Sequence, residues 1–269
     1  MIIKALSIAG FDGSGGAGIQ ADLKTFSALG CYAMTVLTAL PIQNTCGVSN
    51  CYSIPPEAIR EQLASIFDDL APDVIKIGML FNQEIVNLVA EFLAIHAQHI
   101  PIVLDPVMIA KSGDRLLLPD AINALKLQLM PLVSIVTPNL DEAEALTGIS
   151  IHDRENMLLA AGAIIDLGAK AVLIKGGHFD GVICADLLLT NDESHWFSAG
   201  RIDTINTHGT GCTLSAAIAA GLAHGLSLVQ SCAQAKVYLS GAIESFKDEV
   251  IGVGNGPVNH FHKIWSKLD

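Results

Sequence analysis

Aromatic side chains are scarce in this chain: Phe, Trp and Tyr make up 5% of the 269 residues, whereas 51% are hydrophobic. A mainly aliphatic core favours helices packed closely on a parallel sheet, whose buried strands read as continuous apolar runs. Basic residues are also few, with 15 Lys and Arg against 27 Asp and Glu, a net charge of −12 and no Lys/Arg run. Since a nucleic-acid-binding protein should present a basic face, we expect no nucleic-acid partner.

Metal-binding and redox cysteine spacings are missing, because none of the six cysteines forms a CxxC pair. In a chain of this size we expect them to stay reduced in the cytoplasm. The stretch Met1–Ala9 is too short for a signal peptide. The segment Thr204–Ala235 has no charged residue, but Gly, Ser, Thr, His and Gln interrupt it, which indicates core helices. We therefore expect a cytoplasmic protein without a membrane partner.

Short apolar runs alternate with longer helical patterns along the whole chain, which predicts an α/β fold: a three-layer α/β/α sandwich around a mostly parallel sheet. No linker or repeat interrupts the pattern, so residues 1–269 are predicted to form one domain. The expected strands are Lys4–Ala9, Ala33–Leu40, Val74–Gly78, Pro101–Asp105, Val133–Thr137, Ala171–Lys175, Ala185–Leu189 and Trp196–Ile202. The expected helices are Gly16–Leu29, Pro56–Leu70, Asn82–His96, Asp120–Leu129, Leu140–Thr147, Arg154–Leu167, Gly209–His224, Leu228–Phe246 and Pro257–Lys267. The last two strands are spaced too closely for helical crossovers and should form an antiparallel edge.

A glycine-rich loop follows the first expected strand. Gly13 to Gly18 match G-x-G-x-x-G, the dinucleotide fingerprint, but that fingerprint also needs an acidic residue about 20 positions further on. No Asp or Glu occurs between Leu23 and Pro56, and no G-K-[S/T] follows the glycines, so neither a nicotinamide site nor a Walker A loop is favoured. We expect a tight turn that closes over a small substrate, with Asp22 one helical turn further along.

A second glycine segment, Thr207 to Thr213, opens an Ala-rich helix. The bare N–H groups of a helix start can bind an anion, and the helix dipole there favours a thiolate at Cys212. The plainer alternative is a buried cysteine that packs at the helix start.

Further polar residues follow other expected strands, and the carboxyl ends of parallel strands share one edge of the sheet. Asp105 and Glu142 could hold magnesium through waters, and Lys175 could reach a phosphate. Asn139 and Glu142 also fit a capping box, and Lys175 could equally be a solvated charge. The amide of Gln43 could read a flat heterocycle or cap a turn.

Jointly, these segments closely resemble the hydroxymethylpyrimidine/phosphomethylpyrimidine kinases of thiamine biosynthesis, in the ribokinase-like superfamily. The resemblance covers nearly the whole chain. Its matching segments are 8–10, 13–25, 43–45, 76–79, 103–108, 137–143, 175–178 and 207–213. Most of the superfamily has aspartate at the position of Cys212. The cysteine points to the pyrimidine kinases and to a subset of pyridoxal kinases.

The resemblance implies a homodimeric kinase that uses ATP and Mg²⁺ to phosphorylate 4-amino-5-hydroxymethyl-2-methylpyrimidine and then its monophosphate. The implied substrate-binding residues are Gln43, Gly10, Ala17, Asp22, Met79 and Val107. The implied nucleotide and metal residues are Lys175 and Asn139 for ATP, and Asp105 and Glu142 for Mg²⁺. The implied catalytic residues are Gly209, Thr210 and Gly211 as the anion hole, and Cys212 as the base. A pyridoxal kinase and a non-catalytic pyrimidine-binding protein are the alternatives.

Overall fold

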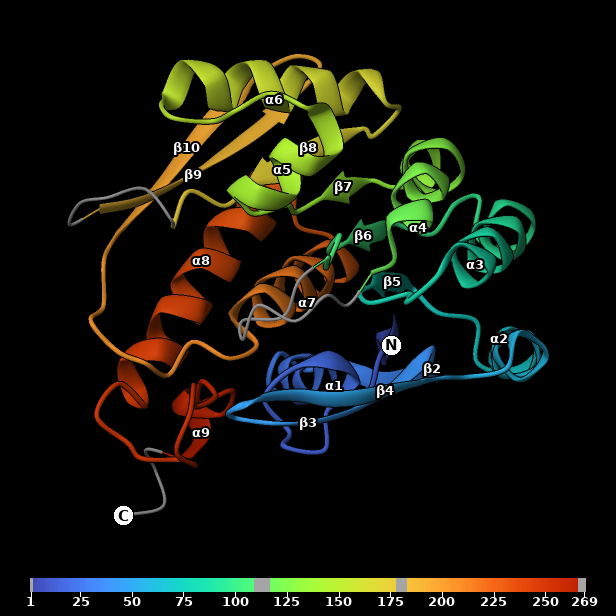
Figure 1. The fold of residues 1–269 in the computed structure, drawn as a ribbon, viewed down its shortest axis with the longest axis horizontal. Coiled ribbons are helices and arrows are strands. Elements are labelled where there is room, and N and C mark those ends of the chain that lie inside the picture. The colour runs from blue at the N-terminus through green and yellow to red at the C-terminus, as the bar shows by residue number, and fades with distance from the viewer. Residues whose placement is uncertain (1, 109–116, 178–182, 266–269) are drawn as a thin grey trace.

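A twisted sheet of eight strands forms the centre of the molecule (Figure 1). The computed structural model describes residues 2–108, 117–177 and 183–265. The strand order is β10-β9-β8-β7-β6-β5-β1-β2. The strands of this sheet are β1 (Lys4–Ala9), β2 (Tyr32–Leu37), β5 (Val74–Ile77), β6 (Ile102–Leu104), β7 (Ile135–Val136), β8 (Ala171–Ile174), β9 (Ile183–Thr190) and β10 (Ser194–Gly200).

Within this sheet, β2, β1, β5, β6, β7 and β8 pair in parallel. Strand β9 pairs antiparallel with β8 and with β10 at one edge, where the short spacing predicted an antiparallel edge. Parallel pairing places the carboxyl ends of β1, β5, β6, β7 and β8 along one rim of the sheet. The polar residues that follow these strands in the sequence therefore meet at that rim.

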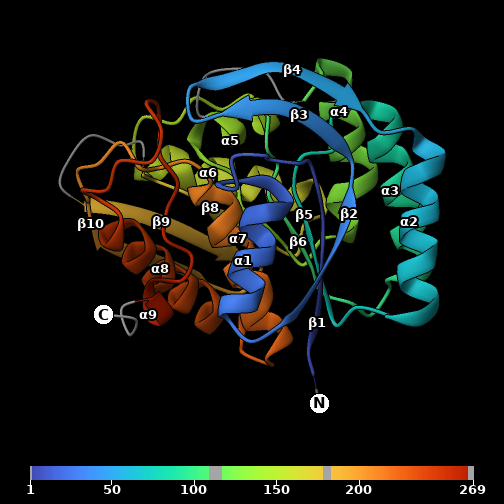
Figure 2. The ribbon, with the colours of Figure 1, turned by 90° about the horizontal axis from the view of Figure 1, so that it is seen from below.

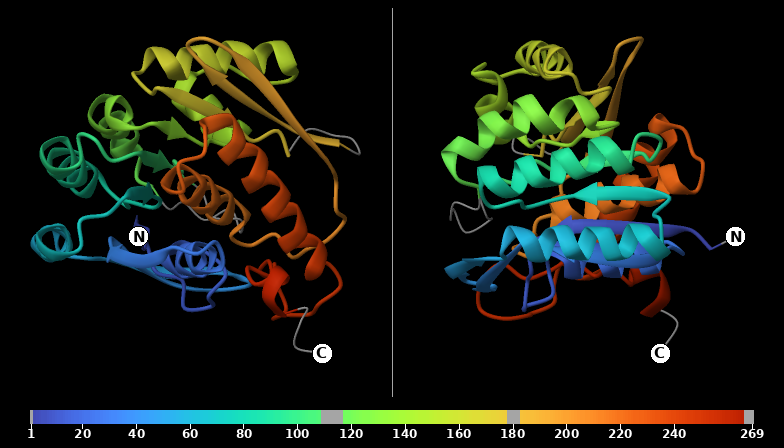
Figure 3. Two further views of the ribbon diagram at one scale, coloured as in Figure 1. Left: turned by 180° about the vertical axis from the view of Figure 1, so that it is seen from behind. Right: turned by 90° about the vertical axis from the view of Figure 1, so that its right-hand side faces the viewer.

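Helices cover both faces of the sheet and complete the predicted α/β/α sandwich. The helices are α1 (Gly18–Ala28), α2 (Pro56–Asp69), α3 (Gln83–His96), α4 (Pro119–Ala124), α5 (Leu140–Thr147), α6 (Arg154–Asp166), α7 (Thr210–Ala223), α8 (Leu228–Ser245) and α9 (His262–Trp265). Helices α1, α7 and α8 lie on one face, and α2, α3, α4 and α6 lie on the other (Figures 1 and 3).

Alternating side chains of the strands enter two separate cores. On β6, Ile102 and Leu104 pack with the α2–α6 side, whereas Val103 packs with α7 and α8. Burial on both faces explains why the strands read as unbroken apolar runs. On β5 the same alternation points Lys76 toward α1 and α7, where an apolar residue would be expected.

A two-stranded hairpin outside the main sheet was not predicted. The expected strand Ala33–Leu40 divides at Thr38 into β2 and β3 (Ala39–Asn44), and β3 pairs antiparallel with β4 (Gly47–Ser53) (Figure 2). The tip of the hairpin contacts the loop before α9, where the N–H of Asn255 donates to the carbonyl of Thr45 at 2.8 Å.

Helix ends follow local sequence signals where such signals exist. Helix α5 spans its predicted residues because Asn139 and Glu142 form the predicted capping box, and Gly148 ends the helix in a left-handed conformation. The predicted helix Pro257–Lys267 is wrong over most of its described length, since only His262–Trp265 is helical and residues 266–269 lie outside the described residues. Within the described ranges, none of the helices is long and apolar enough to cross a membrane.

Candidate active site

A cavity of about 810 Å³ opens at the rim formed by the strand carboxyl ends. It gathers nearly all of the residues predicted from the sequence. Those on its wall are Gly10, Ala17, Gln43, Met79, Asp105, Val107, Asn139, Glu142, Lys175, Gly209, Thr210, Gly211 and Cys212. His178, part of one matching segment, lies outside the described residues.

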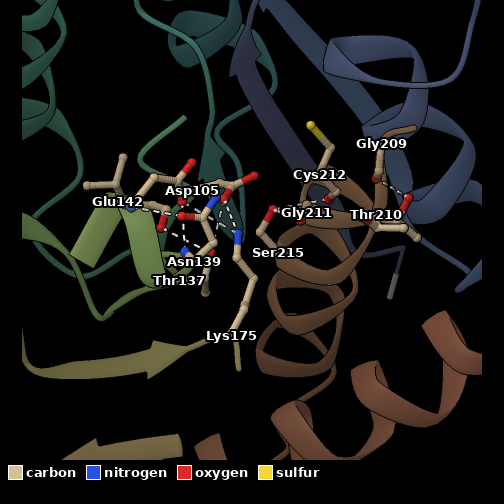
Figure 4. A network of polar contacts seen from close by, with 12 residues as sticks. Asp105, Thr137, Asn139, Glu142, Lys175, Gly209, Thr210, Gly211, Cys212 and Ser215 are labelled. Carbon is tan, nitrogen blue, oxygen red and sulfur yellow. Dashed lines mark hydrogen bonds and ion pairs between the residues drawn. The ribbon is translucent and has the colours of Figure 1, made fainter. Parts of the chain in front are cut away.

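Lys175 forms the positive centre of one side of this cavity (Figure 4). Its Nζ atom lies 3.0 Å from Oδ1 of Asp105 and 3.8 Å from Oε2 of Glu142. Burial by itself would lower the pKa of Lys175, but the two carboxylates raise it above its usual value. Lys175 is thus a largely buried, permanently charged cation, and the alternative of a solvated side chain is wrong.

Glu142 both caps helix α5 and forms an ion pair with Lys175. Its Oε2 atom accepts the N–H of Asn139 at 2.8 Å, and the Asn139 side chain accepts the N–H of Glu142 at the same distance. Burial and the neighbouring Asp105 raise the pKa of Glu142 to about 7, although Lys175 opposes the shift. Further positive charge nearby would therefore stabilise the ionised form of this carboxyl group.

The start of α7 lies directly against this charged cluster. Gly209 caps the helix with φ 77°, and a Cβ there would lie 1.7 Å from the carbonyl oxygen of Gly16, so only glycine fits. A Cβ on Gly211 would lie 3.3 Å from Nζ of Lys175. The N–H groups of a first helical turn lack intrahelical partners, so this turn and Lys175 together can hold an anion.

Cys212 lies in the first turn of α7, as predicted, but its thiol is not ionised at neutral pH. Burial raises the pKa of the thiol to about 11, although Lys76 and the N–H of Gly18 favour the thiolate. The expectation that the helix dipole would lower this pKa is therefore wrong, because desolvation is the stronger effect. In Figure 4 the Cys212 side chain points away from Lys175.

Asp22, predicted to line the cavity, is fully buried instead, and Lys76 occupies the cavity wall beside it. Nζ of Lys76 lies 2.9 and 2.8 Å from the two carboxylate oxygens of Asp22, one of which also accepts from Ser7. Burial alone would lower the pKa of Lys76, but Asp22 raises it well above its usual value. A fixed positive charge thus lies under the cavity near Cys212.

The glycine loop after β1 wraps around a carboxylate of its own chain. Asp12 accepts the N–H groups of Ser14, Gly16 and Ala17 at 2.9, 3.0 and 2.7 Å. These are the groups that a dinucleotide-binding loop offers to a phosphate. The match to the fingerprint therefore has a structural explanation that requires no dinucleotide.

A second part of the cavity wall, named the acceptor side below, comes from β3 and from the residues after β1 and β5. Nε2 of Gln43 donates to the carbonyl of Phe11 at 3.1 Å, and no donor to the Gln43 amide oxygen occurs among the residues that the structure describes. A Cβ on Gly10 would lie 3.0 Å from Sδ of Met79, so Gly10 leaves room for that side chain. The sequence predicted that Gln43 follows a strand, but in the structure it lies within β3.

A protein-only metal cluster is not formed by the residues that the structure describes, since no group of three or more His, Cys, Asp or Glu converges there. Asp105 and Glu142 supply two carboxylates at one place. This is the donor set typical of Mg²⁺, which keeps waters and takes further oxygens from phosphates. All six cysteines are free thiols.

The profile of the phosphomethylpyrimidine kinase family matches residues 12–259. The chain belongs to this family. It is 51% identical over 265 residues to the hydroxymethylpyrimidine/phosphomethylpyrimidine kinase of Salmonella typhimurium, which covers 98% of this chain and 99% of the relative.

Solved structures agree with this family assignment. The phosphomethylpyrimidine kinase of Clostridium difficile has a TM-score of 0.80 and 42% identity, and covers 90% of this chain and 99% of that one. The pyridoxal kinase of Staphylococcus aureus, solved with ADP, has a TM-score of 0.90 and 35% identity, and covers 98% and 95% of the two chains. The predicted fold and family are confirmed, and the fold is shared with pyridoxal kinases.

Three charged or polar groups near the site received no role from the sequence. They are Asp12, Lys76 and His208, all within segments that match the family or lie next to one. A lysine in the middle of the apolar strand Val74–Ile77 was the available signal for Lys76. No local pattern pairs Asp12 with His208, because 196 positions separate them.

Proposed function

We propose that the protein transfers the γ-phosphoryl group of ATP to the hydroxymethyl group of 4-amino-5-hydroxymethyl-2-methylpyrimidine, and then to the resulting monophosphate. The product would be the diphosphate used in thiamine biosynthesis. Membership of the phosphomethylpyrimidine kinase family and relatives of that name at about 50% identity support this substrate over pyridoxal. Two pyridoxal kinases of known structure, from Staphylococcus aureus and Bacillus subtilis, are 34% and 38% identical.

The observation that carries the proposal is the position of the first turn of α7. Gly211 lies against Lys175 and Asp105, and Cys212 follows beside the acceptor side of the same cavity. A phosphoryl group held on the N–H groups of Thr210 to Cys212 would lie between nucleotide and acceptor. Phosphoryl transfer depends mainly on such positioning and on neutralising charge.

Each cavity residue then has a proposed task. Lys175 and Asn139 would contact the ATP phosphates. The oxygen of Gln43 would accept from the amino group of the pyrimidine. Gly10, Ala17, Met79 and Val107 would enclose the ring and exclude water, which limits ATP hydrolysis. Asp22 would act through Lys76, whose charge suits the anionic acceptor of the second transfer.

Asp105 and Glu142 would hold the Mg²⁺ ion of the nucleotide, directly or through waters. The two carboxylates fit such an ion because both are buried, and because the raised pKa of Glu142 indicates a group that gains from added positive charge. The ion would supply charge neutralisation on the phosphates.

Cys212 is proposed as the base for the acceptor hydroxyl. Because its pKa is about 11, only a small fraction is thiolate at neutral pH, and this thiolate would accept the hydroxyl proton to give the thiol. The proton would move late in the transfer, as the new oxygen–phosphorus bond forms. Little negative charge develops early on the attacking oxygen in a loose phosphoryl-transfer transition state, so late removal of the proton is sufficient.

The deciding experiment is a product assay. The purified protein is incubated with MgATP and hydroxymethylpyrimidine, and the monophosphate and then the diphosphate are followed by chromatography and mass spectrometry. Pyridoxal is assayed in parallel. A higher kcat/KM for pyridoxal would assign the pyridoxal kinase activity instead, and pyrimidine binding without ATP turnover would indicate a binding protein.

A homodimer in the cytoplasm remains our proposal for the assembly and its location. Analytical ultracentrifugation of the purified protein would test the dimer, and fractionation of cells would test the location.

A further inference from the structure

The side chains of Asp12 and His208 join two segments that both line the cavity, the glycine loop after β1 and the segment that leads into α7. Nε2 of His208 lies 2.8 Å from Oδ2 of Asp12, although the residues are 196 positions apart. The Asp12 side chain is fully buried, and that of His208 is 14% exposed. The family resemblance assigned neither residue a role.

Asp12 is hydrogen-bonded to the glycine loop on the acceptor side of the cavity. The same Oδ2 atom accepts the N–H groups of Gly16 and Ala17, and Ala17 forms part of the cavity wall. The neighbouring carbonyl of Phe11 accepts from Gln43. A shift of the Asp12 carboxylate would therefore move the wall around the acceptor.

His208 is connected to the first turn of α7, which is the proposed phosphate-binding turn. His208 directly precedes the turn Gly209–Gly211, and its own N–H donates to the carbonyl of Gly256 at 3.0 Å. Its ring is thus attached at one end to the α7 start and at the other to the glycine loop.

The two loops pack backbone to backbone. A Cβ on Gly16 would lie 2.4 Å from Cδ2 of His208, and one on Gly209 would lie 1.7 Å from the carbonyl oxygen of Gly16. This contact limits how closely the loops can approach but has no preferred direction. The hydrogen bond between the His208 and Asp12 side chains is directional, so it also favours one relative position of the loops.

We propose that His208 is a positioning residue for phosphoryl transfer, which through Asp12 fixes the acceptor loop relative to the phosphate-binding turn of α7. This inference rests on the proposed kinase function and adds a requirement to it. A misplacement of about 1 Å can cost about 100-fold in rate, so a link between the two halves of the site bears on turnover more than on affinity.

The test compares two substitutions at one position. His208→Leu removes the donor and keeps an apolar side chain, whereas His208→Gln places an amide nitrogen as many bonds from Cβ as Nε2. The matched control is His99→Leu, because His99 is exposed and away from the cavity. For each protein we would measure kcat, both KM values, the melting temperature and the ATP consumed per phosphorylated product.

His208→Leu is expected to lower kcat by about 100-fold while both KM values stay within about threefold, because alignment and not binding is lost. ATP consumed per product should rise, since water can then compete with the misaligned acceptor. His208→Gln should recover most of kcat and of the coupling, and His99→Leu should match the wild type.

Two results would overturn the inference. One is an unchanged kcat and coupling ratio in His208→Leu; the other is a loss in both His208 variants that only follows their melting temperatures. The measurements use whichever acceptor the wild type phosphorylates. Failure of the wild type on the pyrimidine therefore counts against the proposed function, whereas a normal His208→Leu counts against the positioning role.

Discussion

The ammonium group of Lys76 contacts both carboxylate oxygens of Asp22, at 2.9 and 2.8 Å, and neither side chain is exposed to solvent. The pair joins the centre of the sheet to α1 directly beneath the cavity. Burial raises the pKa of Asp22, and the charge and hydrogen bonds of Lys76 oppose that shift, so the carboxylate depends on Lys76 as its counter-ion.

Lys76→Met should destabilise the fold strongly, because it leaves Asp22 buried without its counter-ion. Removing one partner of a buried pair costs about 3 to 5 kcal/mol. The matched control is Arg60→Met, since Arg60 pairs with Glu91 at 3.5 Å on the surface and should cost less than about 1 kcal/mol. Urea unfolding measures both values. Equal midpoints for the two variants would show that Lys76 is not needed to neutralise Asp22.

Gln43→Ala should raise KM for the pyrimidine about tenfold, the effect of one lost hydrogen bond to a substrate amino group. KM for ATP should stay close to that of the wild type, because Gln43 lies on the acceptor side. Steady-state kinetics with each substrate varied in turn give both values, with the exposed Gln98→Ala as control. Equal increases in both KM values would place Gln43 outside the acceptor pocket.

Cys212→Ala should lower kcat about 100-fold, the usual contribution of a general base, with an unchanged melting temperature. The pH profile tests the base role itself. Because the pKa of the folded thiol is raised to about 11, the thiolate fraction increases with pH throughout the range 7 to 9.5. The wild-type kcat should therefore rise across this range more steeply than that of the variant. Parallel profiles would mean that Cys212 only contacts the acceptor.

Asp12 should contribute to stability in an acid-sensitive manner. Burial by itself would raise the pKa of this carboxyl group, but the hydrogen bonds from His208 and Ser14, the charge of His208 and the N–H of Ala17 lower it from 3.8 to about 2. A lowered pKa means that the folded state prefers the carboxylate. The resulting stability, about 2 kcal/mol, is present above about pH 4 and is lost as the pH falls toward 2.

Unfolding in urea between pH 5 and 2 measures this contribution. Asp12→Asn should reduce the dependence of the unfolding free energy on pH over that interval, whereas the exposed Asp69→Asn should leave it unchanged. A wild-type slope in Asp12→Asn would show that other carboxyl groups cause the acid sensitivity.

Local signals made much of the fold predictable. Helix α5 begins and ends as expected because a capping box and a glycine mark both ends, and β9 and β10 could be assigned because their spacing excludes a crossover helix. Strand β3 carries Pro41, Gln43 and Asn44, so its alternation is weak. Only its first two residues were predicted as strand, as the end of Ala33–Leu40, and β4 was not predicted. The segment after Pro257 is held by tertiary contacts such as the bond from Tyr238 to the His260 carbonyl, which no local pattern encodes.

The site could be predicted as a collection of strand-end residues but not as an electrostatic system. Parallel topology brings Asp105, Asn139 and Lys175 together whatever their side chains do. The protonation of Cys212 depends on how far burial outweighs the helix dipole, which the sequence does not specify. The burial of Asp22 likewise depends on Lys76, a partner 54 positions away.

The carboxylate of Asp12 has a consequence for the recognition of glycine loops in general. The loop from Gly13 to Gly18 has the spacing of a pyrophosphate binder, yet its inward N–H groups are already occupied by an anion that is covalently part of the chain. In this loop a side-chain carboxylate takes the place that a bound phosphate has in a dinucleotide-binding loop. An acidic side chain just before the first glycine can therefore occupy the N–H groups that would otherwise bind a phosphate. The loop then has a structural role instead of a ligand-binding one.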